Sequence, residues 1–137
     1  LVGNAVVAVV ASLPFLVGAA AAGDASAGLP LFLVAIPLHL AREVTKDIAD
    51  MAGDRGHRRS VALRWGARTA SAIALLSVAA YAGVAMVAFA PAGARRLALL
   101  PSLLLATWAA AVAPERRAPL LLKLAMLLAM AALPLLR

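Results

Sequence analysis

Four carboxylates lie close together in the stretch REVTKDIADMAGDR, residues 42–55: Glu43, Asp47, Asp50 and Asp54. If this stretch is an α-helix, its rotation of about 100° per residue places all four within an arc of about 60°. Apolar residues occupy the opposite side: Val44, Ile48, Met51 and Ala52. Hard divalent cations prefer carboxylate oxygens, and Mg²⁺ commonly combines one or two carboxylates with the phosphates of a substrate. The spacing therefore indicates a site for a metal or a diphosphate.

Such a row of acids needs positive charge beside it. Like-charged side chains four residues apart on a helix each cost a few tenths of a kcal/mol when exposed, and more where water is scarce. Basic residues stand within and directly after the row: Lys46, Arg55, Arg58 and Arg59. Arginine binds phosphate through paired donors, so these residues are candidates for diphosphate binding. The alternatives are a solvated acidic face and a basic loop that meets anionic lipid headgroups.

The surrounding chain is far more apolar than a soluble protein. Of its 137 residues, 65% are hydrophobic and 14% charged, with a mean hydropathy of +0.98, whereas soluble domains are about half apolar and a quarter charged. The composition predicts an integral membrane protein with no nucleic-acid partner. The absence of cysteine excludes disulfides, thiolate metal sites and thiol nucleophiles.

The hydrophobic pattern predicts an all-α, multi-pass bundle of about five transmembrane helices in one membrane domain. The expected segments are about 5–22, 29–48, 67–90, 97–113 and 119–136, with a motif loop over about 47–66. Alternating apolar and polar positions, which a membrane β-barrel requires, do not occur in them. Because the chain begins at Leu1 inside an apolar segment, we expect it to be the C-terminal part of a longer protein.

The second segment predicts where the acidic row lies in the membrane. Only residues 29–41 are continuously apolar apart from His39, yet a helix needs about twenty residues to cross a bilayer. A helix that begins at Leu29 would therefore end near Ile48, with Arg42 and Glu43 at membrane depth. Charges at that depth are costly unless they face protein or water. The segment therefore predicts a polar cavity at this end of the helix.

The distribution of basic residues predicts the orientation of the bundle. The loop over 42–68 and the loop at 115–117 are separated by two segments, so they should lie on the same side of the membrane. Together they contain most of the Lys and Arg residues, against Arg95, Arg96 and Arg137 on the other side. The positive-inside rule then places the motif loop in the cytoplasm.

These residues resemble a known family. REVTKDIADMAGDRGHRRSVALRWG, residues 42–66, is similar to the second aspartate-rich motif of the UbiA superfamily of intramembrane prenyltransferases. Its pattern is R-E-x-x-K-D-x-x-D-x-x-G-D, followed by a basic stretch, a small hydroxyl residue and a glycine, here Ser60 and Gly66. The LVGN at residues 1–4 also resembles the segment that precedes this motif. The resemblance covers the layout of the whole chain but is specific over about 25 residues.

The resemblance implies a fold and a chemistry. The family has nine transmembrane helices around a cavity open to lipid, and two aspartate-rich motifs hold Mg²⁺ and a polyprenyl diphosphate. The prenyl chain is then transferred to an acceptor. The five segments would be helices five to nine, so this chain alone would lack the first motif and half of the active site.

The resemblance also implies roles for individual residues. Asp50 and Asp54 match the metal ligands of the motif, with Asp47 as an additional acid of the metal site. Lys46 matches a lysine on the diphosphate side. The expected catalytic set is thus Asp50, Asp54 and Lys46, and the expected diphosphate-binding set is Lys46, Arg55, Arg58 and Arg59.

The residues leave more than one class of prenyl acceptor open. The R-E-x-x-K-D form resembles the branch that transfers geranylgeranyl groups to geranylgeranylglyceryl phosphate in ether-lipid synthesis. The alternative within the family is an aromatic acceptor of the quinone, tocopherol or chlorophyll type. Outside it, a CDP-alcohol phosphotransferase would need D-G-x-x-A-R, which is absent. A cation transporter would carry acids in several spans, and those of this chain are confined to one helix end.

Overall fold

The computed structural model of the protein describes residues 1–51, 60–112 and 116–136. These residues form five α-helices: α1 (Val2–Ala21), α2 (Leu29–Asp50), α3 (Val61–Ala88), α4 (Leu100–Ala111) and α5 (Ala118–Ala132). Three short 3-10 helices join or follow them: η1 (Ala25–Gly28), η2 (Ala90–Leu99) and η3 (Leu133–Leu136). The predicted all-helical fold is confirmed.

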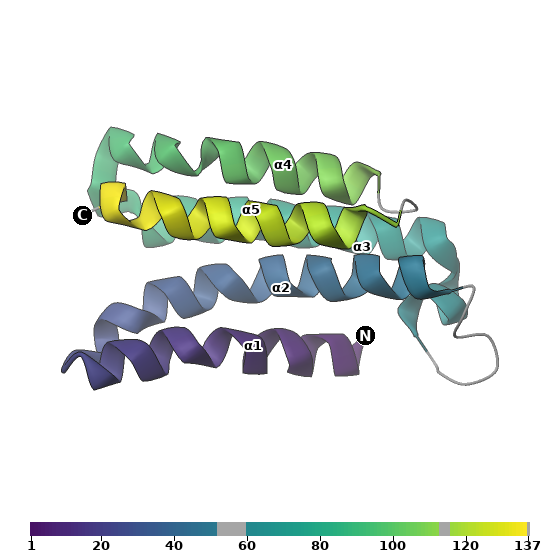
Figure 1. Ribbon diagram of the computed structural model, residues 1–137, viewed down its shortest axis with the longest axis horizontal. Helices are drawn as coiled ribbons and strands as arrows, with labels where there is room; N and C mark the ends of the chain where they lie inside the picture. Colours follow the sequence, from purple (N-terminus) through teal and green to yellow (C-terminus); the bar gives the residue numbers. More distant parts are fainter. Residues whose placement is uncertain (52–59, 113–115, 137) are drawn as a thin grey trace.

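The five helices lie side by side, and successive helices run in opposite directions (Figure 1). The last turn of α2, the first turn of α3, the end of α4 and the start of α5 lie at one end of the bundle, which we call the motif end. The 3-10 helices η1 and η2 and the C-terminal residues lie at the other end. The two basic regions of the sequence therefore flank the same end, as expected from the number of helices between them.

Proline positions help to define where the helices begin. Pro30, Pro101 and Pro119 stand in the first turns of α2, α4 and α5. Backbone N–H groups in a first turn have no partner within the helix, so the missing N–H of proline costs nothing there and its fixed φ favours the helix. These residues start the helices without breaking a hydrogen bond.

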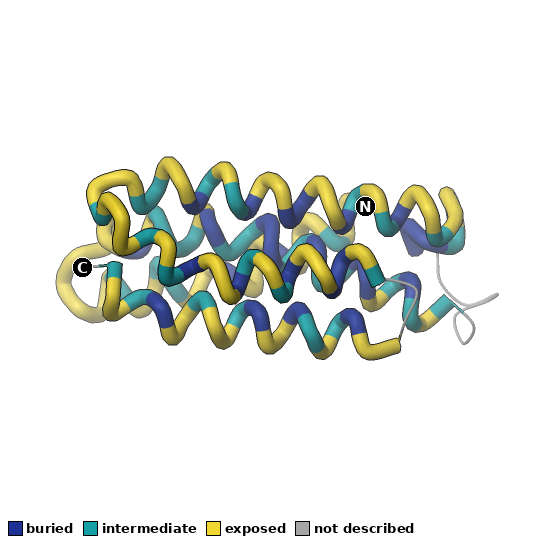
Figure 2. The backbone as a smooth tube through the Cα atoms, turned by 90° about the horizontal axis from the view of Figure 1, so that it is seen from above, coloured by how far each residue is buried: buried dark blue, intermediate teal, exposed yellow. Residues whose placement is uncertain are grey.

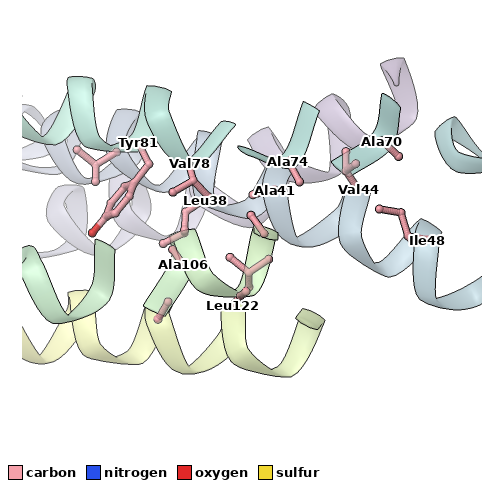
Figure 3. Close-up of a cluster of buried hydrophobic side chains, with 14 of the residues drawn as sticks. Leu38, Ala41, Val44, Ile48, Ala70, Ala74, Val78, Tyr81, Ala106 and Leu122 are labelled. Carbon is pink, nitrogen blue, oxygen red and sulfur yellow. The ribbon is translucent and has the colours of Figure 1, made fainter. Parts of the chain in front are cut away.

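Helix α2 is central to the core and packs against α1, α3 and α5. Its buried apolar side chains recur every three or four residues: Val34, Leu38, Ala41, Val44 and Ile48. The facing residues of α3 are mostly small, including Ala70 and Ala74, with Val78 and Tyr81 further along (Figure 3). Small side chains let helix backbones approach closely, which favours the van der Waals packing that helps to hold helices together in lipid.

The outer faces of the bundle are exposed (Figure 2), and many of the exposed residues are large and apolar. Val2, Leu76 and Val87 are 80%, 69% and 78% exposed, which suits contact with lipid rather than water. Within the described ranges, four helical stretches are long and apolar enough to cross a membrane: Val2–Ala21, Ala25–Asp50, Val61–Ala88 and Ala118–Leu136. Helix α4 has only 12 residues, so a crossing by the segment 97–113 stays a prediction.

The connection between α2 and α3 is shorter than the motif loop predicted over 47–66. Helix α2 continues through Asp50, and α3 already begins at Val61. The early start has a local cause, because the hydroxyl of Ser60 accepts a hydrogen bond from the backbone N–H of Leu63 as an N-cap. Gly66 then interrupts the helix with φ +83° and ψ 158°, a conformation essentially restricted to glycine.

Candidate functional site

The last three turns of α2 have one side in the core and one side that carries charge. Val44, Thr45 and Ile48 are buried. Lys46 and Asp50 are exposed, while Glu43 and Asp47 are half-buried. The sequence correctly separated the apolar side of this helix from its charged side, because both follow from the helical period.

The three carboxylates of the sequence pattern that the structure describes, Glu43, Asp47 and Asp50, do not form one cluster. Glu43 pairs with the guanidinium of its neighbour Arg42. The side chains of this pair are 16% and 25% exposed respectively, so the pair is partly shielded from solvent and its attraction is stronger than on an open surface. This ion pair neutralises the first acid of the row locally and relieves its repulsion with Asp47.

Asp47 lies at a junction of three helices. Its Oδ2 accepts a hydrogen bond of 3.0 Å from the side-chain amide of Asn4 in α1. The same oxygen accepts a bond of 3.3 Å from the backbone N–H of Val61, the first residue of α3. Sequence analysis missed both partners, since neither is related to Asp47 by helical spacing.

Asp50 and Lys46 remain without such partners. Both side chains are exposed at the motif end, and neither forms an ion pair or hydrogen bond with another described residue. A pair between Lys46 and Asp50, which their spacing permits, is therefore not formed. Among the expected metal ligands within the described ranges, Asp50 is the one whose two oxygens are both open to a ligand.

Four of the expected site residues lie outside the described residues: Asp54, Arg55, Arg58 and Arg59. Within the described part of the chain, no group of three or more His, Asp or Glu side chains is close enough to hold a metal ion. The donor chemistry at the end of α2 nevertheless fits Mg²⁺, which takes one or two carboxylates and completes its shell with water and phosphate oxygens.

One apolar cavity, of about 170 Å³, lies between the helices in the half of the bundle away from the motif end. All of α1, α2, α3 and α5 contribute to its lining, which includes Phe15, Leu38, Phe89 and Met126. His39 and Tyr81 also reach it, and the hydroxyl of Tyr81 forms a buried hydrogen bond of 2.9 Å with that of Ser102. Its wall is therefore almost entirely hydrocarbon.

The polar cavity expected at the acidic end of α2 stays a prediction, because residues 52–59 lie outside the described residues. Three cavities lined by described residues are apolar, and Lys46, Asp47 and Asp50 do not line them. Lys46 and Asp50 are exposed at this end of α2.

Comparison with known protein families gives a match that includes these residues. The UbiA prenyltransferase family matches residues 1–120, which include the acidic face of α2 and its partners in α1 and α3. The chain belongs to the UbiA prenyltransferase family. With four candidate spans and this membership, it is an integral membrane protein.

Two curated relatives, from two strains of Halobacterium salinarum, are named digeranylgeranylglyceryl phosphate synthase. Each is 42% identical to this UbiA-family chain over an alignment of 72 residues that covers 44% of the chain and 26% of the relative. The chain thus spans about a quarter of the length of the relatives it matches. No solved structure gives a significant match.

Proposed function

We propose that the protein transfers a prenyl group from a polyprenyl diphosphate to a lipid acceptor and releases diphosphate. The preferred donor is geranylgeranyl diphosphate and the preferred acceptor geranylgeranylglyceryl phosphate. Family membership supports the reaction class, and the similarity to digeranylgeranylglyceryl phosphate synthases over part of the chain supports this acceptor. The observation that carries the proposal is that the carboxylate of Asp50 and the ammonium of Lys46 are both exposed at the end of a candidate membrane helix.

Asp50 and Asp54 are the proposed metal-binding residues. Asp50 presents its carboxylate at the last turn of α2, where no described side chain competes for it. Bound Mg²⁺ would stabilise the negative charge that develops on the leaving diphosphate. Asp47 belongs to the expected metal set as well, but its Oδ2 is already committed to two donors, and its part is argued in the next subsection.

Lys46, Arg55, Arg58 and Arg59 are the proposed diphosphate-binding residues. Lys46 is exposed on the same side of α2 as Asp50 and one turn before it. Its ammonium can bind a phosphate oxygen as the bond to the prenyl carbon breaks, which stabilises the leaving group without accepting or donating a proton. The arginines add planar, permanently charged donors that suit phosphate.

The apolar cavity is the proposed place for the far end of the prenyl chain. It lies between the helices in the half of the bundle opposite the motif end. A diphosphate held at Asp50 would leave its hydrocarbon chain to run along α2 toward Leu38 and Phe15. Burial of that chain contributes about 25 cal/mol to binding for each Å² removed from water. The excess of basic residues at the motif end supports a cytoplasmic orientation of that end.

Membranes that contain the intact protein test the proposal directly. They are incubated with radiolabelled geranylgeranyl diphosphate and either geranylgeranylglyceryl phosphate or an aromatic acceptor such as homogentisate. We expect label in the ether lipid, in a reaction that EDTA stops and added Mg²⁺ restores. Label in the aromatic product alone would replace the acceptor, and label in neither product would overturn the proposed activity.

A further inference from the structure

The start of α3 is held by two oxygens from different elements. The hydroxyl of Ser60 accepts from the N–H of Leu63, and the carboxylate of Asp47 accepts from the N–H of Val61 at 3.3 Å. The first N–H groups of a helix have no partner inside it, so they need acceptors from outside the helix. Two residues therefore cap the start of α3: Asp47, which belongs to α2, and Ser60, which directly precedes α3.

The amide of Asn4 fixes the orientation of that cap. It donates to the same Oδ2 of Asp47 at 3.0 Å, from a residue 43 positions earlier in the chain. Asn4 is half-buried and Val61 is 2% exposed. Both hydrogen bonds converge on one oxygen inside the junction of α1, α2 and α3. An oxygen with two donors in a partly buried junction is directed toward the protein and not toward the open side of α2.

We propose that Asp47 is a positioning residue that ties the last turns of α2 to α1 and α3, and that it acts through its hydrogen bonds rather than as a metal ligand. Asp47 lies between Lys46 and Asp50 in the sequence. Its two bonds fix the rotation of α2 at the point where Lys46 and Asp50 face the diphosphate. This inference rests on the proposed function for its kinetic consequences, but the junction itself is independent of the reaction.

The substitution Asp47→Asn separates the positioning role of Asp47 from a role as a metal ligand. Because both donors use one oxygen, the amide oxygen of Asp47→Asn can accept both bonds, although the charge needed for a strong metal ligand is gone. Asp47→Ala removes acceptor and charge together. Asn4→Ala removes one donor and leaves the carboxylate in place.

The kinetic arm measures KM for geranylgeranyl diphosphate, kcat and the half-saturating Mg²⁺ concentration on the intact protein, well below its melting temperature. We expect Asp47→Ala to raise this KM by about tenfold or more, because the charged groups of α2 lose their fixed orientation. Asp47→Asn should restore KM to within about fivefold of wild type, since a neutral acceptor is weaker than a charged one. Its Mg²⁺ half-saturation should not change. If Asp47 only stabilises the fold, Asp47→Ala would lower the fraction of active protein and leave KM unchanged. That result would overturn the inference.

The structural arm measures amide hydrogen exchange of the peptide that covers residues 60–66, for the same variants. Exchange should be faster in Asp47→Ala and Asn4→Ala and close to wild type in Asp47→Asn. If Asp47→Asn instead loses activity as Asp50→Asn does, raises the Mg²⁺ requirement and leaves exchange unchanged, Asp47 is a metal ligand and the inference is wrong. If the wild-type protein transfers no prenyl group, the proposed function fails, while the exchange data still decide whether Asp47 holds the junction.

Discussion

The side-chain amide of Asn4 lies 3.0 Å from Oδ2 of Asp47 and joins the first turn of α1 to the acidic face of α2. The two residues are 43 positions apart in sequence. Their contact divides the acidic row into parts with different surroundings: Glu43 is paired with Arg42, Asp47 is hydrogen-bonded inside the bundle, and Asp50 is open at its end. Three carboxylates on one side of the same helix thus have three different surroundings.

Replacement of Asp50 by Asn should lower prenyl transfer on the order of 10²-fold or more, because the leaving diphosphate loses a metal-anchoring charge. Asp54→Asn should have a similar effect. The measurement is the initial rate of labelled lipid formation at saturating Mg²⁺, with detergent-extracted protein checked for folding by its melting temperature.

Asp24→Asn is the matched control for these changes. Asp24 lies at the other end of the bundle, and hydrogen bonds from the Ser26 hydroxyl and the Ala27 backbone hold the pKa of its carboxyl below its ordinary value. It is therefore a charged carboxylate like Asp50 but far from the motif end. A rate loss in Asp24→Asn equal to that in Asp50→Asn would show a general charge effect and count against the site.

Replacement of Lys46 by Ala should raise KM for the prenyl diphosphate by about tenfold to a hundredfold, the usual range for loss of one charge-assisted hydrogen bond. Lys46→Arg keeps the charge and should recover most of the affinity. Steady-state kinetics with varied diphosphate measure both. Lys123→Ala, also an exposed lysine but on α5, is the control, and an unchanged KM in Lys46→Ala would remove Lys46 from the site.

Replacement of Ala35 by Phe should shift the preferred donor toward shorter prenyl chains. Ala35 lines the apolar cavity of about 170 Å³, and an added ring would fill much of that space. The measurement is the ratio of rates with twenty-carbon and ten-carbon diphosphates. Ala79→Phe places the same ring on an exposed face of α3 and should leave the ratio unchanged. An equal ratio in the two variants would place the prenyl chain elsewhere.

Replacement of Gly28 by Ala should destabilise the protein by about 1–3 kcal/mol, the usual cost of overpacking. An added Cβ would lie 2.5 Å from the backbone oxygen of Phe15 and 2.7 Å from Cβ of Ala19, so α1 and α2 would have to separate. Gly83→Ala is the matched control, since its Cβ would meet no atom within 4 Å and alanine favours the helix. Thermal melting in detergent measures both, and equal melting temperatures would contradict the close approach of α1 to α2.

The sequence by itself determined the helices, the lipid-facing composition and the common face of the acidic residues. These features follow from local periodicity and from the cost of placing polar groups in hydrocarbon, so they can be read without knowing which helices touch. The resemblance of residues 42–66 to the UbiA motif likewise needed no structure, and the family match over residues 1–120 agrees with it.

Only the tertiary structure decided what each acid contacts. Asp47 and Asp50 are equivalent by spacing, yet one faces α1 and α3 and the other faces the open end of the bundle. That difference depends on where Asn4 and Val61 are placed by the packing of three helices. No sequence period relates these partners, because contacts between helices are set by the side chains buried between them and not by the order of residues along one chain.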